Sequence, residues 1–225
     1  MYEIYVLGMF VDLLKNSGYN ELEVLSELLR LSDNPEMGLL KLGYMGRASR
    51  LINSKLRCHK LSLEDKALFL KIEQALNFAL EQCERYNNKK VFRDESRIFT
   101  TAQIGYVLDW FNRRKGKIIC YPAFVSTYSN KKRIPSGYPL LLEILTSTNS
   151  KAYDLSSIKP DHPEQEVLFK SKSCFEIIGV DAINNIVTLN ESKLKPDITV
   201  YNNQEYFSIL NKFNSTTNSY HIDDI

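Results

Sequence analysis

The sequence predicts an α+β protein, with a helical lobe over residues 1–87 and a mainly β domain over residues 88–225. Two observations carry this prediction. Apolar residues recur at helical spacing within the first 86 residues. After Gly116 the chain consists of short apolar runs, separated by loops rich in Ser, Asn, Lys and Pro, which is typical of strands.

Helices account for the first lobe. Asn20 is placed to cap a helix rich in leucine, and the Asn34-Pro35 step marks the next boundary. Ser62-x-x-Asp65 resembles a capping box, and the apolar stripe after it predicts a helix through about Arg85. We expect that stripe to be core; it comprises Leu68, Phe69, Ile72, Leu76, Ala79, Leu80 and Cys83.

The second domain opens with a short strand at Val91-Phe92-Arg93. Thr100-x-x-Gln103 then begins a helix that ends near residues 113–114, before Gly116. A helix at residues 204–212 and a polar tail close the chain. The strands expected between these helices are residues 117–121, 124–128, 140–146, 166–169, 175–180, 186–189 and 198–201.

Composition narrows the function classes. Of 225 residues, 44% are hydrophobic and 25% charged, as in ordinary globular proteins. The net charge of +2 is too balanced for a protein that binds phosphate backbones, so we expect no nucleic-acid partner. The four cysteines form no CxxC pair, which predicts reduced thiols in a cytosolic working environment. Residues 1–14 lack a basic leader and are too short to span a bilayer, although a specialised secretion signal would leave no such trace.

Glu164-Gln165-Glu166 heads the apolar run Val167-Leu168-Phe169. In a strand, Glu164 and Glu166 would point to the same face, with Cα atoms about 6.5–7 Å apart. One carboxylate can then stabilise positive charge while the other takes a proton, as at a sugar C1 that passes through an oxocarbenium-like transition state. An exposed acidic edge leading into a buried strand is the alternative for the pair alone.

Other catalytic and metal-binding motifs are absent from the sequence. It contains no Walker loop, GxGxxG, HExxH or GxSxG motif. His162 lies near the Glu pair, and we interpret it as a surface residue. The basic run ending at Arg133 is typical of an exposed loop, or of one that faces phosphates.

Three segments in order resemble the mono-ADP-ribosyltransferases of the Arg–Ser–Glu type. They are Val91-Phe92-Arg93, the strand Phe124-Val125-Ser126-Thr127-Tyr128, and Glu164-Gln165-Glu166. The resemblance covers residues 88–202 and is sharpest over residues 164–180. It implies two packed, mainly antiparallel sheets around an NAD cleft. It also implies NAD as a substrate, no metal, and a toxin or effector that is secreted or delivered into a host cell.

The resemblance also implies residue roles. Arg93 would hold the NAD pyrophosphate, Ser126 would orient the catalytic carboxylate of Glu166, and Glu164 would engage an arginine of the target protein. The loop 151–163 would recognise that target. The further contacts implied are Phe124, Thr127, Tyr128 and Arg133 to NAD, and Leu155 and Ile158 to the target.

Two positions depart from the family pattern. Tyr128 replaces the last serine of the usual Ser-Thr-Ser, and Asp94 follows Arg93 where glycine is common. Asp94 brings a negative charge near the expected pyrophosphate. Two alternatives therefore stay open beside arginine-directed transfer: a degenerate NAD-binding or interaction module, and an NAD glycohydrolase.

Overall fold

The computed structural model describes residues 34–57, 61–95, 99, 101–131, 140–156, 158 and 165–211. The chain divides into two compact units between Gln82 and Cys83. The expected boundary after residue 87 remains an expectation. The predicted helix around residues 20–29 lies outside the described residues.

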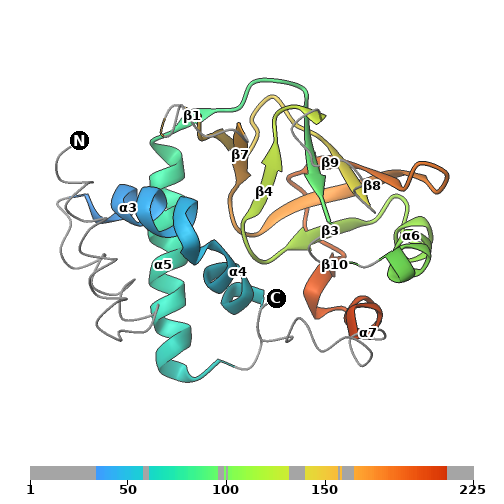
Figure 1. Ribbon diagram of the computed structural model, residues 1–225, viewed down its shortest axis with the longest axis horizontal. Helices are drawn as coiled ribbons and strands as arrows, with labels where there is room; N and C mark the ends of the chain where they lie inside the picture. Colours follow the sequence, from blue (N-terminus) through green and yellow to red (C-terminus); the bar gives the residue numbers. More distant parts are fainter. Residues whose placement is uncertain are drawn as a thin grey trace. The chain divides into compact units, whose positions relative to one another are not determined.

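The first unit is helical in its described part (Figure 1). Asn34 caps the first described helix, because its side-chain oxygen accepts a 3.1 Å hydrogen bond from the Met37 amide. Pro35 occupies the first helical position, where its missing N–H costs nothing. The elements are α3 (Pro35–Gly38), the π-helical η1 (Leu39–Ala48), α4 (Ser49–Arg57) and α5 (Leu63–Glu81).

The α5 helix confirms the predicted apolar stripe except at its two ends, since Leu68 is half-buried and Cys83 is half-buried and lies beyond the helix. Its buried residues pack toward η1, α3 and α4. The helix ends at Glu81 rather than near Arg85, because Glu84–Arg85 forms a strand, β1. Cys83 falls on the helical spacing of the stripe, and this extended the predicted helix beyond its observed end. The buried stripe is Phe69, Ile72, Leu76, Ala79 and Leu80.

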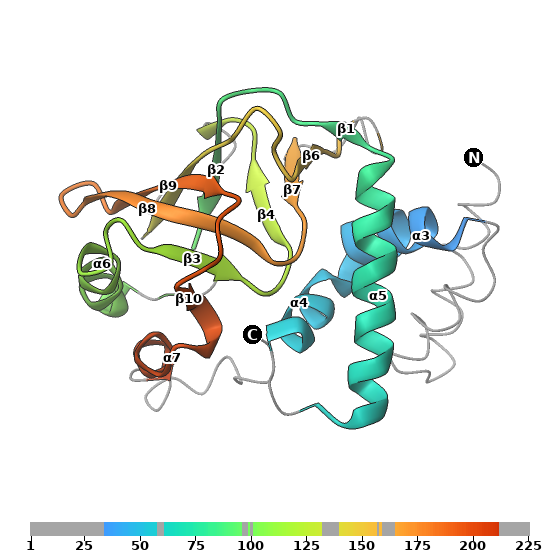
Figure 2. The ribbon, with the colours of Figure 1, turned by 180° about the vertical axis from the view of Figure 1, so that it is seen from behind.

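The second unit contains the ten described strands, which pair in the order β1-β6-β7-β4-β2-β5-β9-β8-β3-β10. Pairing is antiparallel except between β5 and β9 and between β3 and β10. The strands curl strongly, so that distant members face one another (Figure 1, Figure 2). The α+β class and the mainly antiparallel pairing are confirmed, and pairing runs continuously where two sheets were expected. The further strands are β2 (Lys90–Asp94), β3 (Ile118–Tyr121), β4 (Val125–Tyr128), β5 (Leu141–Leu145), β6 (Ala152–Asp154), β7 (Glu166–Phe169), β8 (Ser173–Asp181), β9 (Ile186–Ser192) and β10 (Ile198–Thr199).

The strands predicted from the sequence agree with the observed ones to within a few residues. Two observed strands were not predicted, and one predicted strand was too long. Strands β1 and β6 were missed because each is only two or three residues long. The predicted strand 198–201 ends at Thr199, where the 3₁₀ turn Val200–Asn202 begins.

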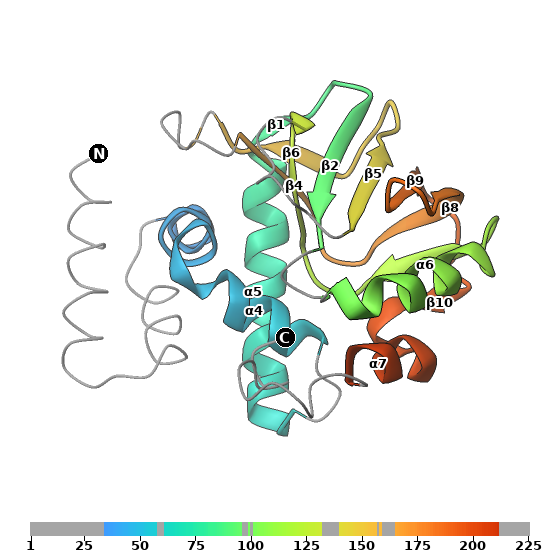
Figure 3. The same ribbon diagram turned by 45° about the vertical axis from the view of Figure 1, so that its right-hand side comes forward.

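Two helices, α6 (Ile104–Asn112) and α7 (Gln204–Asn211), pack on the curled sheet (Figure 3). A 3₁₀ turn, Thr101–Gln103, leads into α6 where the capping motif predicted a helix start. The buried rings of Trp110, Phe111 and Tyr206 meet edge to face within the sheet's core.

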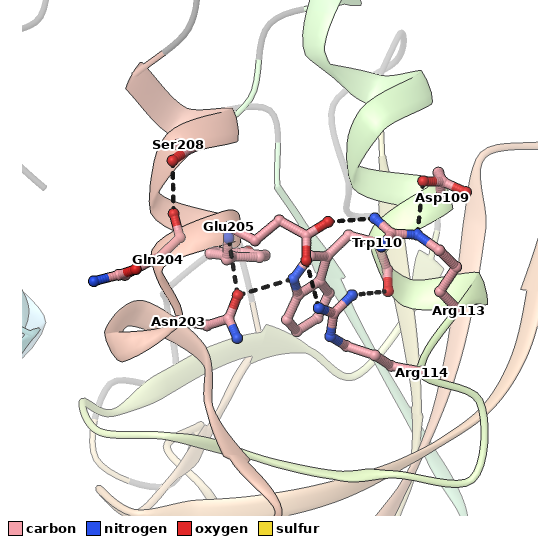
Figure 4. Close-up of polar contacts among 9 residues, drawn as sticks. Asp109, Trp110, Arg113, Arg114, Asn203, Gln204, Glu205 and Ser208 are labelled. Carbon is pink, nitrogen blue, oxygen red and sulfur yellow. Dashed lines mark hydrogen bonds and ion pairs between the residues drawn. The ribbon is translucent and has the colours of Figure 1, made fainter.

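Polar contacts fasten α6 to α7 (Figure 4). The Glu205 carboxylate accepts hydrogen bonds from Arg113 and Arg114, the latter at 2.5 Å between Oε2 and Nη2. Asn203 Oδ1 accepts from Trp110 Nε1 at 3.2 Å. The Arg114 guanidinium lies 4.4 Å from the centroid of the Trp110 ring. The α6–α7 corner is therefore a fixed support for one side of the sheet.

Of the helices described, none combines the length and apolar character needed to cross a bilayer.

Candidate active site

Strands β4 and β7 run side by side and carry the predicted site residues Ser126, Tyr128 and Glu166 (Figure 2). Tyr128 lies directly opposite Glu166, and Ser126 lies opposite Leu168. Phe92 of β2 lies opposite Tyr128 from the other side. Because paired residues point to one face and side chains alternate, Phe92, Ser126, Tyr128 and Glu166 share one face of the sheet. Glu166 thus has a tyrosine beside it and the predicted serine on the diagonal.

Gln165, the middle residue of the Glu pair, adopts a left-handed conformation with φ of 45°. Few non-glycine residues do so, and such residues cluster at functional sites. Two contacts accompany it: Ser129 donates its amide to the Gln165 carbonyl at 3.3 Å and its hydroxyl to Oε1 at 3.3 Å. Strand β7 begins at Glu166. The same-face geometry of Glu164 and Glu166 remains a prediction, because Glu164 lies outside the described residues.

The Arg93 guanidinium joins β2 to the backbone of β4. Its Nη1 donates a 2.9 Å hydrogen bond to the Ser126 carbonyl, and its Nε donates a 2.6 Å hydrogen bond to Glu95 Oε1. Because side chains alternate along β2, the Arg93 side chain leaves the strand on the face opposite to that of Phe92. The side chain is only 13% exposed. The Arg93 side chain therefore contacts the main-chain carbonyl of Ser126 and not the Ser126 hydroxyl.

Glu95 is the buried counter-ion of this arginine, at 1% exposure. Among the described residues no donor contacts its second oxygen, Oε2. Burial is the largest single effect and lowers the pKa of Arg93, but the charge and hydrogen bond of Glu95, together with Tyr201 and Tyr121, offset it and leave the pKa above its ordinary value. The ring hydroxyls of Tyr121 and Tyr201 act on the same guanidinium. Burial, followed by these two tyrosines, raises the pKa of Tyr206. The guanidinium stays charged inside a buried, polar cluster.

Two residues predicted to contact NAD are buried in the strand pair. Phe124, just before β4, is enclosed. The Thr127 hydroxyl donates a 2.6 Å hydrogen bond to the Val167 carbonyl. That bond fastens β4 to β7 on the face away from Glu166. The NAD contacts of Phe124 and Thr127 remain predictions.

The described part of the predicted recognition loop lies against β7. The Leu155 amide donates a 3.0 Å hydrogen bond to the Glu166 carbonyl, and the Leu155 side chain is 1% exposed. In this conformation Leu155 does not present its side chain to a target. Ile158 is half-buried and donates its amide to the Leu155 carbonyl at 3.1 Å. Their roles as target contacts remain predictions.

Arg133 and Glu164 lie outside the described residues. Within the described ranges, no three His, Cys, Asp or Glu side chains gather as a metal ion would require.

Two residues of the site were missed from the sequence. Glu95 follows Arg93 at i+2, so its position on the same side of the chain was the available signal. The left-handed Gln165 had no signal, because glutamine carries no preference for that conformation.

Known structures share this fold. The Vis toxin, an ADP-ribosyltransferase from Vibrio splendidus, matches at 17% identity and a TM-score of 0.51, over 86% of each chain. The C3 exoenzyme of Clostridium limosum matches at 20% identity and a TM-score of 0.55, over 81% of this chain and 95% of that one. C3larvin, an ADP-ribosyltransferase from Paenibacillus larvae, matches at 16% identity and a TM-score of 0.53, over 73% of this chain and 99% of that one.

A comparison with curated proteins finds no match. The family model of the ADP-ribosyltransferase exoenzymes, in contrast, matches residues 19–205, well over half of the sequence. The chain belongs to the ADP-ribosyltransferase exoenzyme family.

Proposed function

We propose that the protein transfers ADP-ribose from NAD to arginine side chains of a target protein. The bond between the nicotinamide nitrogen and ribose C1′ breaks, and a bond from C1′ to a guanidinium nitrogen forms. Nicotinamide leaves with the bonding electron pair, and the guanidinium releases one proton. The products are ADP-ribosylarginine and nicotinamide.

The observation that carries this proposal is the shared face of Ser126, Tyr128 and Glu166. A carboxylate held on a rigid strand, next to hydroxyl groups that fix its orientation, is suited to stabilise an oxocarbenium-like transition state. In this proposal Glu166 bonds the ribose 2′-hydroxyl and opposes the positive charge that develops at C1′. Ser126 and Tyr128 keep its carboxylate in place.

Arginine is proposed as the acceptor because of Glu164. A guanidinium has a pKa above about 12 and needs a base to become nucleophilic. A second carboxylate two residues from Glu166 can supply that base. The related Vis enzyme was crystallised in complex with agmatine, which carries a guanidinium group. That match has 15% identity and a TM-score of 0.52, over 78% of this chain and 85% of that one.

Arg93 would bind the NAD pyrophosphate. Its Nε and Nη1 hold Glu95 and the Ser126 carbonyl, so the phosphate would meet the remaining Nη2 edge. Arg133 would add a second charge, and Phe124, Thr127 and Tyr128 would shape the pocket. The loop 151–163, with Leu155 and Ile158, would recognise the target. Secretion, or delivery into a host cell, would bring the enzyme to that target.

The test compares Glu166→Gln with Glu176→Gln, a control in β8 at a half-buried position between the core residues Phe175 and Ile177. Glu166→Gln should lower transfer of labelled ADP-ribose to lysate proteins by about 10²–10³-fold, because it removes one preorganised charge. NAD affinity, measured by calorimetry, should change by less than about threefold, because the substitution is nearly isosteric. The label should be released by neutral hydroxylamine, as arginine linkages are. Full activity of Glu166→Gln would disprove the assignment.

The same assay separates the alternatives. An NAD glycohydrolase would release nicotinamide without labelling protein. A binding module would bind NAD and release none.

A further inference from the structure

Two cysteines face each other across neighbouring strands, away from the sheet's core. Cys120 of β3 lies directly opposite Cys174 of β8. Their neighbours Ile119, Tyr121 and Phe175 belong to the core cluster. Because side chains alternate along a strand, both thiols lie together on the opposite face.

The hydrogen-bond pattern shows which kind of pair this is. Ile177 donates its amide to the Lys117 carbonyl at 3.0 Å, and Gly116 donates to the Ile177 carbonyl at 2.8 Å. Gly116, with φ of +79°, is the left-handed residue of a β-bulge beside that pair. Counting from Lys117–Ile177, hydrogen-bonded pairs alternate with non-hydrogen-bonded ones, so Cys120–Cys174 is non-hydrogen-bonded.

Such pairs bring Cα atoms to about 4.5 Å, within the range of about 4.4–6.8 Å that a disulfide spans. Cβ atoms of directly opposite residues also lie closest in these pairs. A disulfide between Cys120 and Cys174 therefore requires rotation of two side chains and no change in strand pairing. Both thiols are free in this structure.

The surroundings make one of the two thiols nucleophilic. Cys174 is half-buried, and Cys120 is buried. The facing Cys120 thiol lowers the pKa of Cys174 to about 7; partial burial opposes this, and the charge of Lys151 adds to it. The more exposed Cys174 is therefore assigned as the attacking thiol, and the buried Cys120 as the thiol that resolves the mixed disulfide.

We propose that Cys120 and Cys174 form a reversible cross-strand disulfide when the protein meets a low-molecular-weight disulfide such as oxidised glutathione. The Cys174 thiolate attacks one sulfur of the reagent, forms a mixed disulfide and expels one glutathione thiolate. Cys120 then gives up its proton and attacks Cys174 Sγ, which expels the second glutathione. The protein loses two electrons and two protons, and one glutathione disulfide becomes two thiols.

The bond would lie in the ribbon that carries the candidate active site. Strand β3 continues into β4 through residues 122–124, and β7 continues into β8 through residues 170–172. The pair Cys120–Cys174 therefore lies on the same two chain segments as the pair Tyr128–Glu166. Oxidation would join these segments covalently at one end of the ribbon.

The experiment incubates the reduced full-length protein with oxidised glutathione, blocks remaining thiols with N-ethylmaleimide and maps peptides by mass spectrometry. We expect an intact mass lower by about 2 Da before blocking, a peptide linking Cys120 to Cys174, and reversal by dithiothreitol. Cys83→Ser is the matched control and should form the same bond, since Cys83 lies outside the strand pair that brings Cys120 opposite Cys174. Cys174→Ser should form none.

Three results would overturn the proposal: unchanged thiols at Cys120 and Cys174, a lasting glutathione adduct at Cys174, or linkage of either residue to Cys58 or Cys83. The peptide map on the unmutated protein decides the matter even where a variant fails to fold. No NAD is present, so the outcome is independent of the proposed transferase activity.

Discussion

Replacing Glu95 by leucine is expected to destabilise the sheet unit by about 3–5 kcal/mol, because it leaves the Arg93 guanidinium buried without its counter-ion. At 2.6 Å and an effective dielectric constant of about 20, the attraction within the pair is about 6 kcal/mol. Desolvation of each ion costs several kcal/mol, so the intact pair gains little over an apolar pair. The unpaired, buried charge of Arg93 in the Glu95→Leu variant therefore determines how much stability is lost.

The double variant Arg93→Met/Glu95→Leu should be more stable than Glu95→Leu alone, because it removes both charges together. Urea unfolding monitored by tryptophan fluorescence is the assay. Trp110 is the only tryptophan in the sequence and is fully buried in the core of the sheet unit, so its emission reports that unit.

The pair Lys90–Glu143 is the matched control, with the same 2.6 Å separation but side chains 41% and 23% exposed. Glu143→Gln should cost no more than about 1 kcal/mol, because water screens this pair. If the double variant lost as much stability as the single variants Arg93→Met and Glu95→Leu added together, the argument from burial would be refuted.

Three further predictions concern other positions of the ribbon. Thr127→Val should cost about 1–2 kcal/mol in urea unfolding, because it deletes the buried bond to the Val167 carbonyl; an unchanged midpoint would contradict this. Gln165→Gly should keep kcat/KM for transfer within a few-fold of wild type, whereas Gln165→Val should lower it, because a β-branched residue resists positive φ by about 1–3 kcal/mol. Equal activity of the two variants would show that this conformation is unimportant. Alkylation of Cys174 should reach half of its limiting rate near pH 7, below the pH of about 8.5 usual for cysteine, because a lowered pKa keeps the thiolate at lower pH; mass spectrometry of quenched samples measures it.

Periodicity predicted the elements that bury one side. The stripe of α5 follows the 3.6-residue repeat, and the continuous apolar run Val167–Phe169 forms a strand buried along its length where one was expected. The short strands β1 and β6 are too brief to show a repeat, and only their pairing with each other and with β7 makes them strands. Sequence reasoning alone could not supply that tertiary context.

The candidate site was predictable in its residue types but not in its contacts. The motif resemblance selected Arg93, Ser126 and Glu166, and the structure places them on three adjacent strands. It could not show that Arg93 meets a backbone carbonyl, because a carbonyl carries no sequence signature. Nor could it find Glu95, whose importance depends on burial.

Gln165 lies just before β7 in a left-handed conformation, next to the residue proposed as the catalytic carboxylate. Glu166 stands at the start of β7, and its pairing with Tyr128 fixes its direction together with the sheet. If Glu164 engages the acceptor as proposed, the conformation of the adjacent Gln165 bears on that step more than on Glu166, which strand pairing already fixes. Substitutions at Gln165 should consequently reduce protein labelling more than nicotinamide release, and equal losses in both would mean that the turn also positions Glu166.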